Sequence, residues 1–187
     1  MRNLRSVIAT ILVLALIGAG CGGENPTKHQ GTSSAFYANS FELPTDTLGW
    51  TGLHPEMFVD GAAPGCGERA LQIGGGCLQP AAALTFSAVR CDKYYAVSLW
   101  GKIDQSRQMG SVMLTIPGDE GMFGPSIAIR VDNVNWTHYR SSELLHVPAG
   151  VDMSLMLFIG GFVPSGMMID NLQIEMVIPA DETSRCD

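Results

Sequence analysis

The feature that most constrains this chain is a series of short segments in which apolar and polar residues alternate. Between Phe36 and Ile178 no run of ten or more residues has a convincing 3.6-residue period, which argues against long helices. Alternation with a period of two places every second side chain on the same face of a β-strand. Turn-forming residues separate the segments, as in Pro117-Gly-Asp119, Asp132-Asn133 and Pro148-Ala-Gly150. The pattern predicts an all-β, two-sheet sandwich of nine or ten strands.

The alternation also predicts which side chains form the core. We expect strands over residues 95–103, 111–116, 126–131, 154–159 and 168–177. Their predicted inward side chains are Tyr95, Val97, Leu99, Ile103, Val112, Leu114, Ile116, Ile127, Ile129, Val131, Leu155, Leu157 and Ile159.

The N-terminus has the features of an export signal. Arg2 and Arg5 precede an apolar run from Val7 to Ile17, which as a helix is about 16 Å long and spans about half of a bilayer core. We therefore interpret residues 1–20 as a signal peptide rather than a transmembrane helix.

The apolar run ends in Ile17-Gly-Ala-Gly-Cys21, which resembles the lipobox of bacterial lipoproteins. The resemblance implies that Cys21 is lipidated and becomes the first mature residue; ordinary secretory cleavage that leaves Cys21 free is the alternative. Residues 21–35 are expected to form the lipidated cysteine and a flexible tether, because residues 22–34 contain no large apolar side chain. With Gly22 after the cysteine, the resemblance implies a lipid-anchored protein of the cell envelope, at the outer membrane in a Gram-negative host.

Charge narrows the range of partners. The chain has 11 Lys and Arg against 18 Asp and Glu, a formal net charge of −7. This balance argues against a nucleic-acid partner, because nucleic-acid binding needs a basic surface. It also argues against attraction to anionic head groups, so membrane contact is expected through the lipid anchor alone.

Several short motifs follow one another in order along the chain: Ser40-Phe-Glu42, Leu48-Gly-Trp50, Ala70–Ile73, Tyr95–Lys102, Trp136–Tyr139, Leu145–Gly150 and Met168–Glu175. The series resembles the galactose-binding-like jelly roll of many β-sandwich carbohydrate-binding modules. The resemblance covers nearly the whole mature domain and implies a jelly roll over residues 36–178 with a glycan partner, followed by a C-terminal tail over 179–187.

The same resemblance implies one structural calcium ion that links the first and last strands. Its carboxylate ligands would be Glu42 and Asp170. Calcium takes six to eight oxygen ligands, so backbone carbonyls would complete the shell. The alternative is that both side chains are solvated carboxylates at strand ends.

Four cysteines follow Cys21, and in an exported protein an even number predicts disulfides. Three pairings are possible, of which we favour Cys66–Cys77 together with Cys91–Cys186. Closing the shorter loop would contribute about 3 kcal/mol. A zinc site is the alternative, but the sequence contains no Cys-x-x-Cys spacing.

The sequence carries no recognisable catalytic motif. We find no Gly-x-Ser-x-Gly, no His-Glu-x-x-His and no phosphate-binding loop, and the four histidines are scattered. We therefore expect a protein that is not an enzyme.

Outward-facing side chains of the central strands are expected to form a ligand face on one sheet. The predicted ligand residues are Trp100, Lys102, Met113, Arg130 and Phe158. An aromatic ring among hydrogen-bonding groups meets both the apolar face and the hydroxyls of a sugar. The family resemblance favours Trp100 as the best single candidate, and Trp100 and Arg130 are predicted to share an open concave face. In the alternative, a loop covers Trp100, and Met113, Met156 and Phe158 pack beneath it as a second small core.

We thus expect a membrane-anchored, non-catalytic lipoprotein that binds a polysaccharide through one sheet face. A methionine-rich face also suits protein contacts, so a lipid-anchored interaction or assembly protein of the cell envelope is the main alternative. A purely structural surface lipoprotein is the third.

Overall fold

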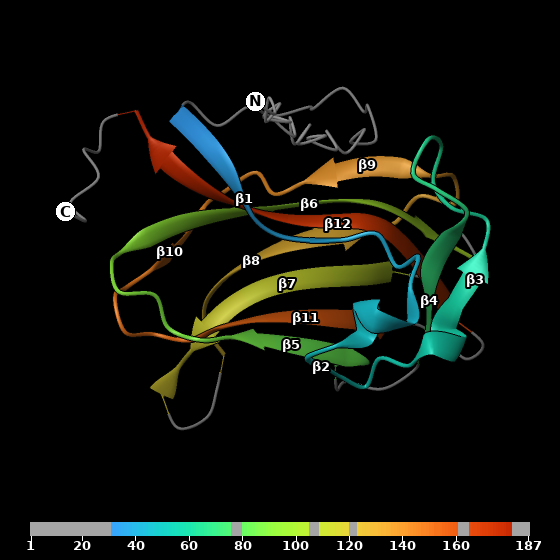
Figure 1. The fold of residues 1–187 in the computed structure, drawn as a ribbon, viewed down its shortest axis with the longest axis horizontal. Coiled ribbons are helices and arrows are strands. Elements are labelled where there is room, and N and C mark those ends of the chain that lie inside the picture. Colours follow the sequence, from blue (N-terminus) through green and yellow to red (C-terminus); the bar gives the residue numbers. More distant parts are fainter. Residues whose placement is uncertain (1–30, 76–79, 105–108, 120–122, 161–164, 181–187) are drawn as a thin grey trace, which may run out of the picture.

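The computed structural model describes residues 31–75, 80–104, 109–119, 123–160 and 165–180. Within these residues, twelve strands form two antiparallel sheets that pack face to face (Figure 1). The predicted all-β jelly-roll sandwich is confirmed. The strand number exceeds the nine or ten expected, because strands of two or three residues are too short to show an alternating pattern.

The seven-stranded sheet follows the path β10-β6-β12-β4-β3, with β1 also paired to β12 and β9 to β6. Its strands are β1 (Gly31–Asn39), β3 (Phe58–Asp60), β4 (Arg69–Gly75), β6 (Lys93–Ile103), β9 (Thr137–Arg140), β10 (Leu145–Val147) and β12 (Ser165–Pro179).

The five-stranded sheet follows the path β2-β5-β11-β7-β8. Its strands are β2 (Trp50–Thr51), β5 (Ala82–Phe86), β7 (Met109–Pro117), β8 (Phe123–Val131) and β11 (Met153–Gly160). Two 3-10 helices, η1 (Pro44–Thr47) and η2 (Pro55–Met57), lie between β1 and β3. No helix in the described part of the chain is long and apolar enough to span a bilayer.

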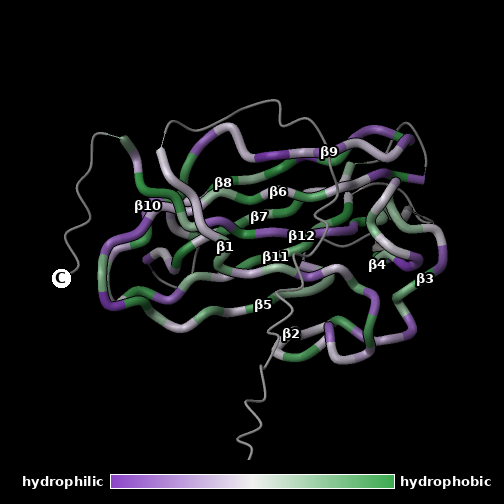
Figure 2. Tube along the Cα trace, turned by 45° about the horizontal axis from the view of Figure 1, so that its top comes forward, coloured by the Kyte–Doolittle hydropathy of each residue, from purple (hydrophilic) through white to green (hydrophobic). Residues whose placement is uncertain are grey.

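The core lies between the sheets and contains the side chains that alternation predicts. All thirteen predicted inward residues are buried. In Figure 2 the central strands β6, β7, β8 and β11 carry hydrophobic stretches, whereas β9 is mostly hydrophilic. Each sheet therefore has one apolar inner face and one outer face on which a ligand site can be built.

The first strand begins earlier than expected. β1 starts at Gly31, within the segment 21–35 that we predicted as a tether. Side chains 31–36 are exposed, and residues 31–35 pair in register with residues 179–175 of β12. Backbone pairing rather than side-chain burial therefore orders this part of the strand, which composition does not reveal. Residues 1–30, with the predicted signal peptide and Cys21, lie outside the described residues.

A β-bulge fixes the middle of β1 to the sandwich. The register with β12 shifts between Ala35 and Tyr37, so Phe36 is an additional residue in the strand. The Phe36 ring contacts Phe86 of β5 and Tyr95 of β6 at centroid distances of 5.3 and 5.0 Å, and Tyr37 also contacts Phe86 at 5.3 Å. Aromatic contacts to both sheets therefore hold β1 from Phe36 onward.

Candidate functional site

The five predicted ligand residues are divided between the two outer faces of the sandwich. Trp100 and Lys102 lie on β6 of the seven-stranded sheet, whereas Met113, Arg130 and Phe158 lie on strands of the five-stranded sheet. Outward side chains of two stacked sheets point in opposite directions. The prediction that Trp100 and Arg130 share a face is therefore wrong. Alternation shows which side chains face outward, but not which sheet a strand joins.

The outer surface of the five-stranded sheet, here called the five-stranded face, is mixed apolar and polar. Strand register aligns Phe158, Ser111 and Arg130 in one row across β11, β7 and β8. Met156 and Met113 lie opposite each other in the next row. The outward side chains of this face, all partly or fully exposed, are Ala83, Thr85, Ser111, Met113, Ser126, Ala128, Arg130, Ser154, Met156 and Phe158.

An aromatic pair lies on this face. The rings of Phe158 and Phe123 contact each other edge to face, with centroids 6.3 Å apart and planes at 86°. Phe123 is 55% exposed. Phe123 was not predicted, because it lies between the predicted turn at 117–119 and the predicted strand at 126–131, and no pattern in the sequence marks it.

Arg130 adds a cation at the edge of the same face. Its Nε lies 3.2 Å from an Asp132 carboxylate oxygen, and the two side chains are 65% and 50% exposed. An ion pair this exposed is weak, so the guanidinium can exchange its partner for a ligand. The five-stranded face thus offers aromatic rings, thioethers, hydroxyls and one cation, which suits non-covalent binding of a molecule with both apolar and hydroxyl groups.

The outer surface of the seven-stranded sheet, here called the seven-stranded face, is occupied by internal contacts. The half-buried Trp100 ring contacts His138 of β9 edge to face at 5.4 Å, and its buried Nε1 has no hydrogen-bond partner among the described residues. Burial, followed by the charge of Arg140, lowers the pKa of His138. Lys102 Nζ lies 4.9 Å from the centroid of Trp136. Trp136 is half-buried, beneath this ammonium group.

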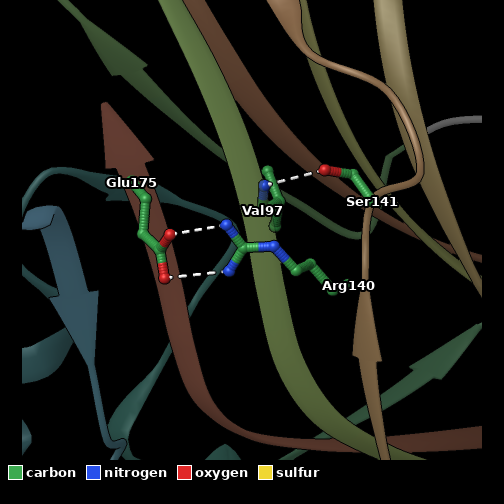
Figure 3. Close-up of polar contacts among 4 residues, drawn as sticks. All are labelled: Val97, Arg140, Ser141 and Glu175. Atoms are coloured by element: carbon green, nitrogen blue, oxygen red, sulfur yellow. Dashed lines mark hydrogen bonds and ion pairs between the residues drawn. The ribbon is translucent and has the colours of Figure 1, made fainter. Parts of the chain in front are cut away.

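A buried ion pair crosses this face. The Arg140 side chain extends from β9 over β6 to Glu175 of β12, where two nitrogens bind the two carboxylate oxygens at 3.0 and 2.6 Å (Figure 3). The side chains are 6% and 20% exposed. Next to this pair, the Ser141 hydroxyl accepts a hydrogen bond from the Val97 amide at 3.2 Å. Trp100 and Lys102 therefore belong to a surface of paired side chains rather than to an open ligand platform.

The two predicted calcium ligands bind the same segment, here called loop 61–69, which consists of the β3–β4 loop and the first residue of β4. The Asp170 carboxylate accepts hydrogen bonds from the Ala63 and Asn171 amides at 2.9 and 2.6 Å. Glu42 Oε1 accepts from the Glu68 and Arg69 amides at 3.0 and 3.1 Å.

The environment of Asp170 disfavours its ionised form. Asp170 is fully buried, and its pKa is raised to about 6, chiefly by burial and in part by the charge of Glu42. The ion pairs among the described residues do not include either carboxylate. Two neighbouring carboxylates without a cationic side chain fit a calcium ion in their chemistry. No cluster of three or more His, Cys, Asp or Glu forms within the described ranges, so backbone carbonyls would have to supply the other ligands.

The cysteines are partly described. Cys66 and Cys91 lie within the described residues. Cys77 and Cys186, their predicted partners, lie outside the described residues, so the pairing itself stays a prediction.

Comparisons with known proteins relate the chain to carbohydrate-binding modules by fold. No protein-family model and no curated protein matches it significantly. The CBM22-1 xylan-binding domain of Paenibacillus barcinonensis Xyn10C superposes with a TM-score of 0.59 and 18% identity, over 82% of this chain and 100% of that domain. The C-terminal family 22 carbohydrate-binding module of Clostridium thermocellum Xyn10B gives a TM-score of 0.55 and 17% identity, over 79% and 96% of the two chains. At these identities the likeness shows the shared β-sandwich fold.

Proposed function

We propose that this chain is a non-catalytic glycan-binding protein that binds a polysaccharide through the five-stranded face. The observation that carries the proposal is the aromatic pair of the half-buried Phe158 and the exposed Phe123, beside Arg130 and a set of hydroxyl groups. Phenyl rings stack on the apolar faces of sugars, and the surrounding polar groups bind their hydroxyls. The fold shared with xylan-binding domains supports a glycan as the partner.

The proposal includes the location inferred from the sequence. Cys21 would carry the lipid that holds the domain at the cell envelope, at the outer membrane in a Gram-negative host. The disulfides Cys66–Cys77 and Cys91–Cys186 would suit this oxidising environment.

A second candidate function is docking of a cell-envelope protein on the same face. The pair Met113 and Met156 at its centre favours this function, because thioether side chains adapt to irregular protein surfaces.

A panel of polysaccharides separates the two functions. We would measure retardation of the full-length protein in gels containing soluble xylan, mixed-linkage β-glucan, galactomannan or pectin, together with a glycan array. We expect Phe158→Ala to weaken binding about tenfold, or about 1.4 kcal/mol. Trp100→Ala, on the opposite face, serves as the matched control and should leave the affinity unchanged. Absence of binding to every glycan, with a specific protein recovered by crosslinking to the same face, would instead establish the docking function.

We also propose one structural calcium ion held by Glu42 and Asp170, which would join β1, β12 and loop 61–69. Bound calcium would relieve the repulsion between the two carboxylates. We expect calcium to raise the melting temperature of chelator-treated protein and to have no such effect on Glu42→Gln. An equal shift in both proteins would place the ion elsewhere, and no shift in the wild type would remove it from the proposal.

A further inference from the structure

The adjoining ends of β7 and β8, at Pro117 and Phe123, depart from a flat sheet on the side of the five-stranded face. Strand register places Phe158 opposite Ser111 and Phe123 opposite Pro117. Ser111 and Pro117 are six residues apart in β7, which corresponds to about 20 Å in an extended strand. The rings of Phe123 and Phe158 nevertheless lie only 6.3 Å apart. A flat sheet would keep the two rings apart, so the described end of β8 must bend toward Phe158 on the outer side of the sheet.

Local sequence accounts for this bend. The register between β7 and β8 shifts between Thr115 and Pro117, and such irregularities bend a strand. A Cβ added to Gly124 would lie 2.7 Å from the Pro117 carbonyl oxygen and 2.9 Å from that of Ile116, so only glycine allows the two strands to approach here. Thr115 faces outward but is buried, and its hydroxyl donates to the Pro125 carbonyl at 3.2 Å. The bend is therefore a packed part of the fold.

We propose that Phe123 forms a wall of the glycan site and contacts the ligand directly; this inference rests on the glycan-binding function proposed above. The Phe123 ring stands at 86° to Phe158 and is more than half exposed. The two rings thus form a corner, in which Phe158 is the floor and Phe123 is the side wall. A sugar ring that stacks on the floor has its edge against the wall, and both contacts bury apolar surface.

The corner selects the physical form of the glycan. A single extended chain can lie along the row of Phe158, Ser111 and Arg130, where aromatic, hydroxyl and cationic groups follow one another across three strands. A flat crystalline surface cannot reach Phe158 while Phe123 projects beside it. The site therefore takes single polysaccharide chains in solution and excludes crystalline polymers.

The test compares Phe123→Ala with a matched exposed-apolar variant. Leu48→Ala removes a side chain that is 75% exposed, in the loop after η1. Retardation would be measured in the soluble polysaccharide of the panel that retards the wild type most, and depletion would be measured on microcrystalline cellulose. We expect Phe123→Ala to bind the soluble chain about tenfold more weakly, Leu48→Ala to match the wild type, and cellulose not to deplete the wild type. Gly124→Ala, which disturbs the bend, should reproduce the loss seen for Phe123→Ala.

The outcomes separate this inference from the function on which it rests. If the wild type binds a soluble glycan and Phe123→Ala binds it equally well, the wall is refuted and the glycan-binding function stands. If cellulose removes the wild type from solution as effectively as the soluble glycan binds it, the exclusion of crystalline surfaces is refuted. If the wild type binds no glycan in the panel or on the array, the proposed function fails, and the inference fails with it.

Discussion

Within the described residues, each outer face of the sandwich carries one arginine–carboxylate pair, and the two pairs differ in almost every other respect. Arg140 and Glu175 on the seven-stranded face are nearly buried and bound through two short contacts. Arg130 and Asp132 on the five-stranded face share one contact and are at least half exposed. A buried pair connects strands, whereas an exposed pair keeps its groups available. This contrast agrees with the proposal that the five-stranded face binds the ligand, whereas the seven-stranded face stabilises the fold.

The largest effect that tests this division concerns stability. We expect Arg140→Ala to lower the free energy of unfolding by about 3 kcal/mol, because it leaves the Glu175 carboxylate largely buried without its main partner. Urea denaturation at pH 7 measures the change. A loss below about 1 kcal/mol, the value typical of a surface pair, would contradict the contrast between the faces.

A second test uses pH and concerns Asp170, which pairs with Trp100 across β12 and β6. Its pKa is about 6 in the folded protein against an ordinary value of 3.8, so the folded state binds the proton more tightly. In chelator, this group should make the protein about 2 kcal/mol more stable as pH falls from 7 to 4.5. The Asp170→Asn variant has no group that titrates at this position. Over the same pH range, its free energy of unfolding should therefore rise less than that of the wild type, by the same amount. If the free energies of unfolding of the two proteins change in parallel with pH, the pKa of Asp170 is not raised in the folded state.

The smallest expected effect concerns the exposed cation. Arg130→Ala should change the free energy of unfolding by less than about 1 kcal/mol. It should weaken glycan binding about threefold, through loss of one charged hydrogen-bond donor. Lys102→Ala removes a cation from the opposite face and should leave the affinity unchanged. Equal losses of affinity in the two variants would indicate a general charge effect rather than a site on the five-stranded face.

The fold could be predicted from this sequence because period-two alternation directly reports side-chain burial. Leu155, Leu157 and Ile159 are inward in the structure for the same reason that they alternate in the sequence. Alternation carries no information on strand order, and consequently Trp100 was grouped with Arg130 although the two lie on different sheets.

The candidate site was only partly predictable. Met113, Arg130 and Phe158 were found as outward residues of regular strands. Phe123 was missed because its position depends on a hairpin bend that arises from packing around Gly124. The pairing of Arg140 with Glu175 was missed as well, because the two residues belong to strands far apart in sequence that are both neighbours of β6.

The bulged first strand would have a mechanical consequence under the proposed lipid anchor at Cys21, which would hold the domain by its N-terminus. Residues 31–35 adhere to β12 through main-chain pairing, whereas Phe36 and Tyr37 are wedged against rings of both sheets. Tension on the N-terminus would therefore separate residues 31–35 from β12, and the separation would stop at Phe36 and Tyr37. The N-terminal tether would lengthen by about 17 Å, while the sandwich and its five-stranded face stayed intact.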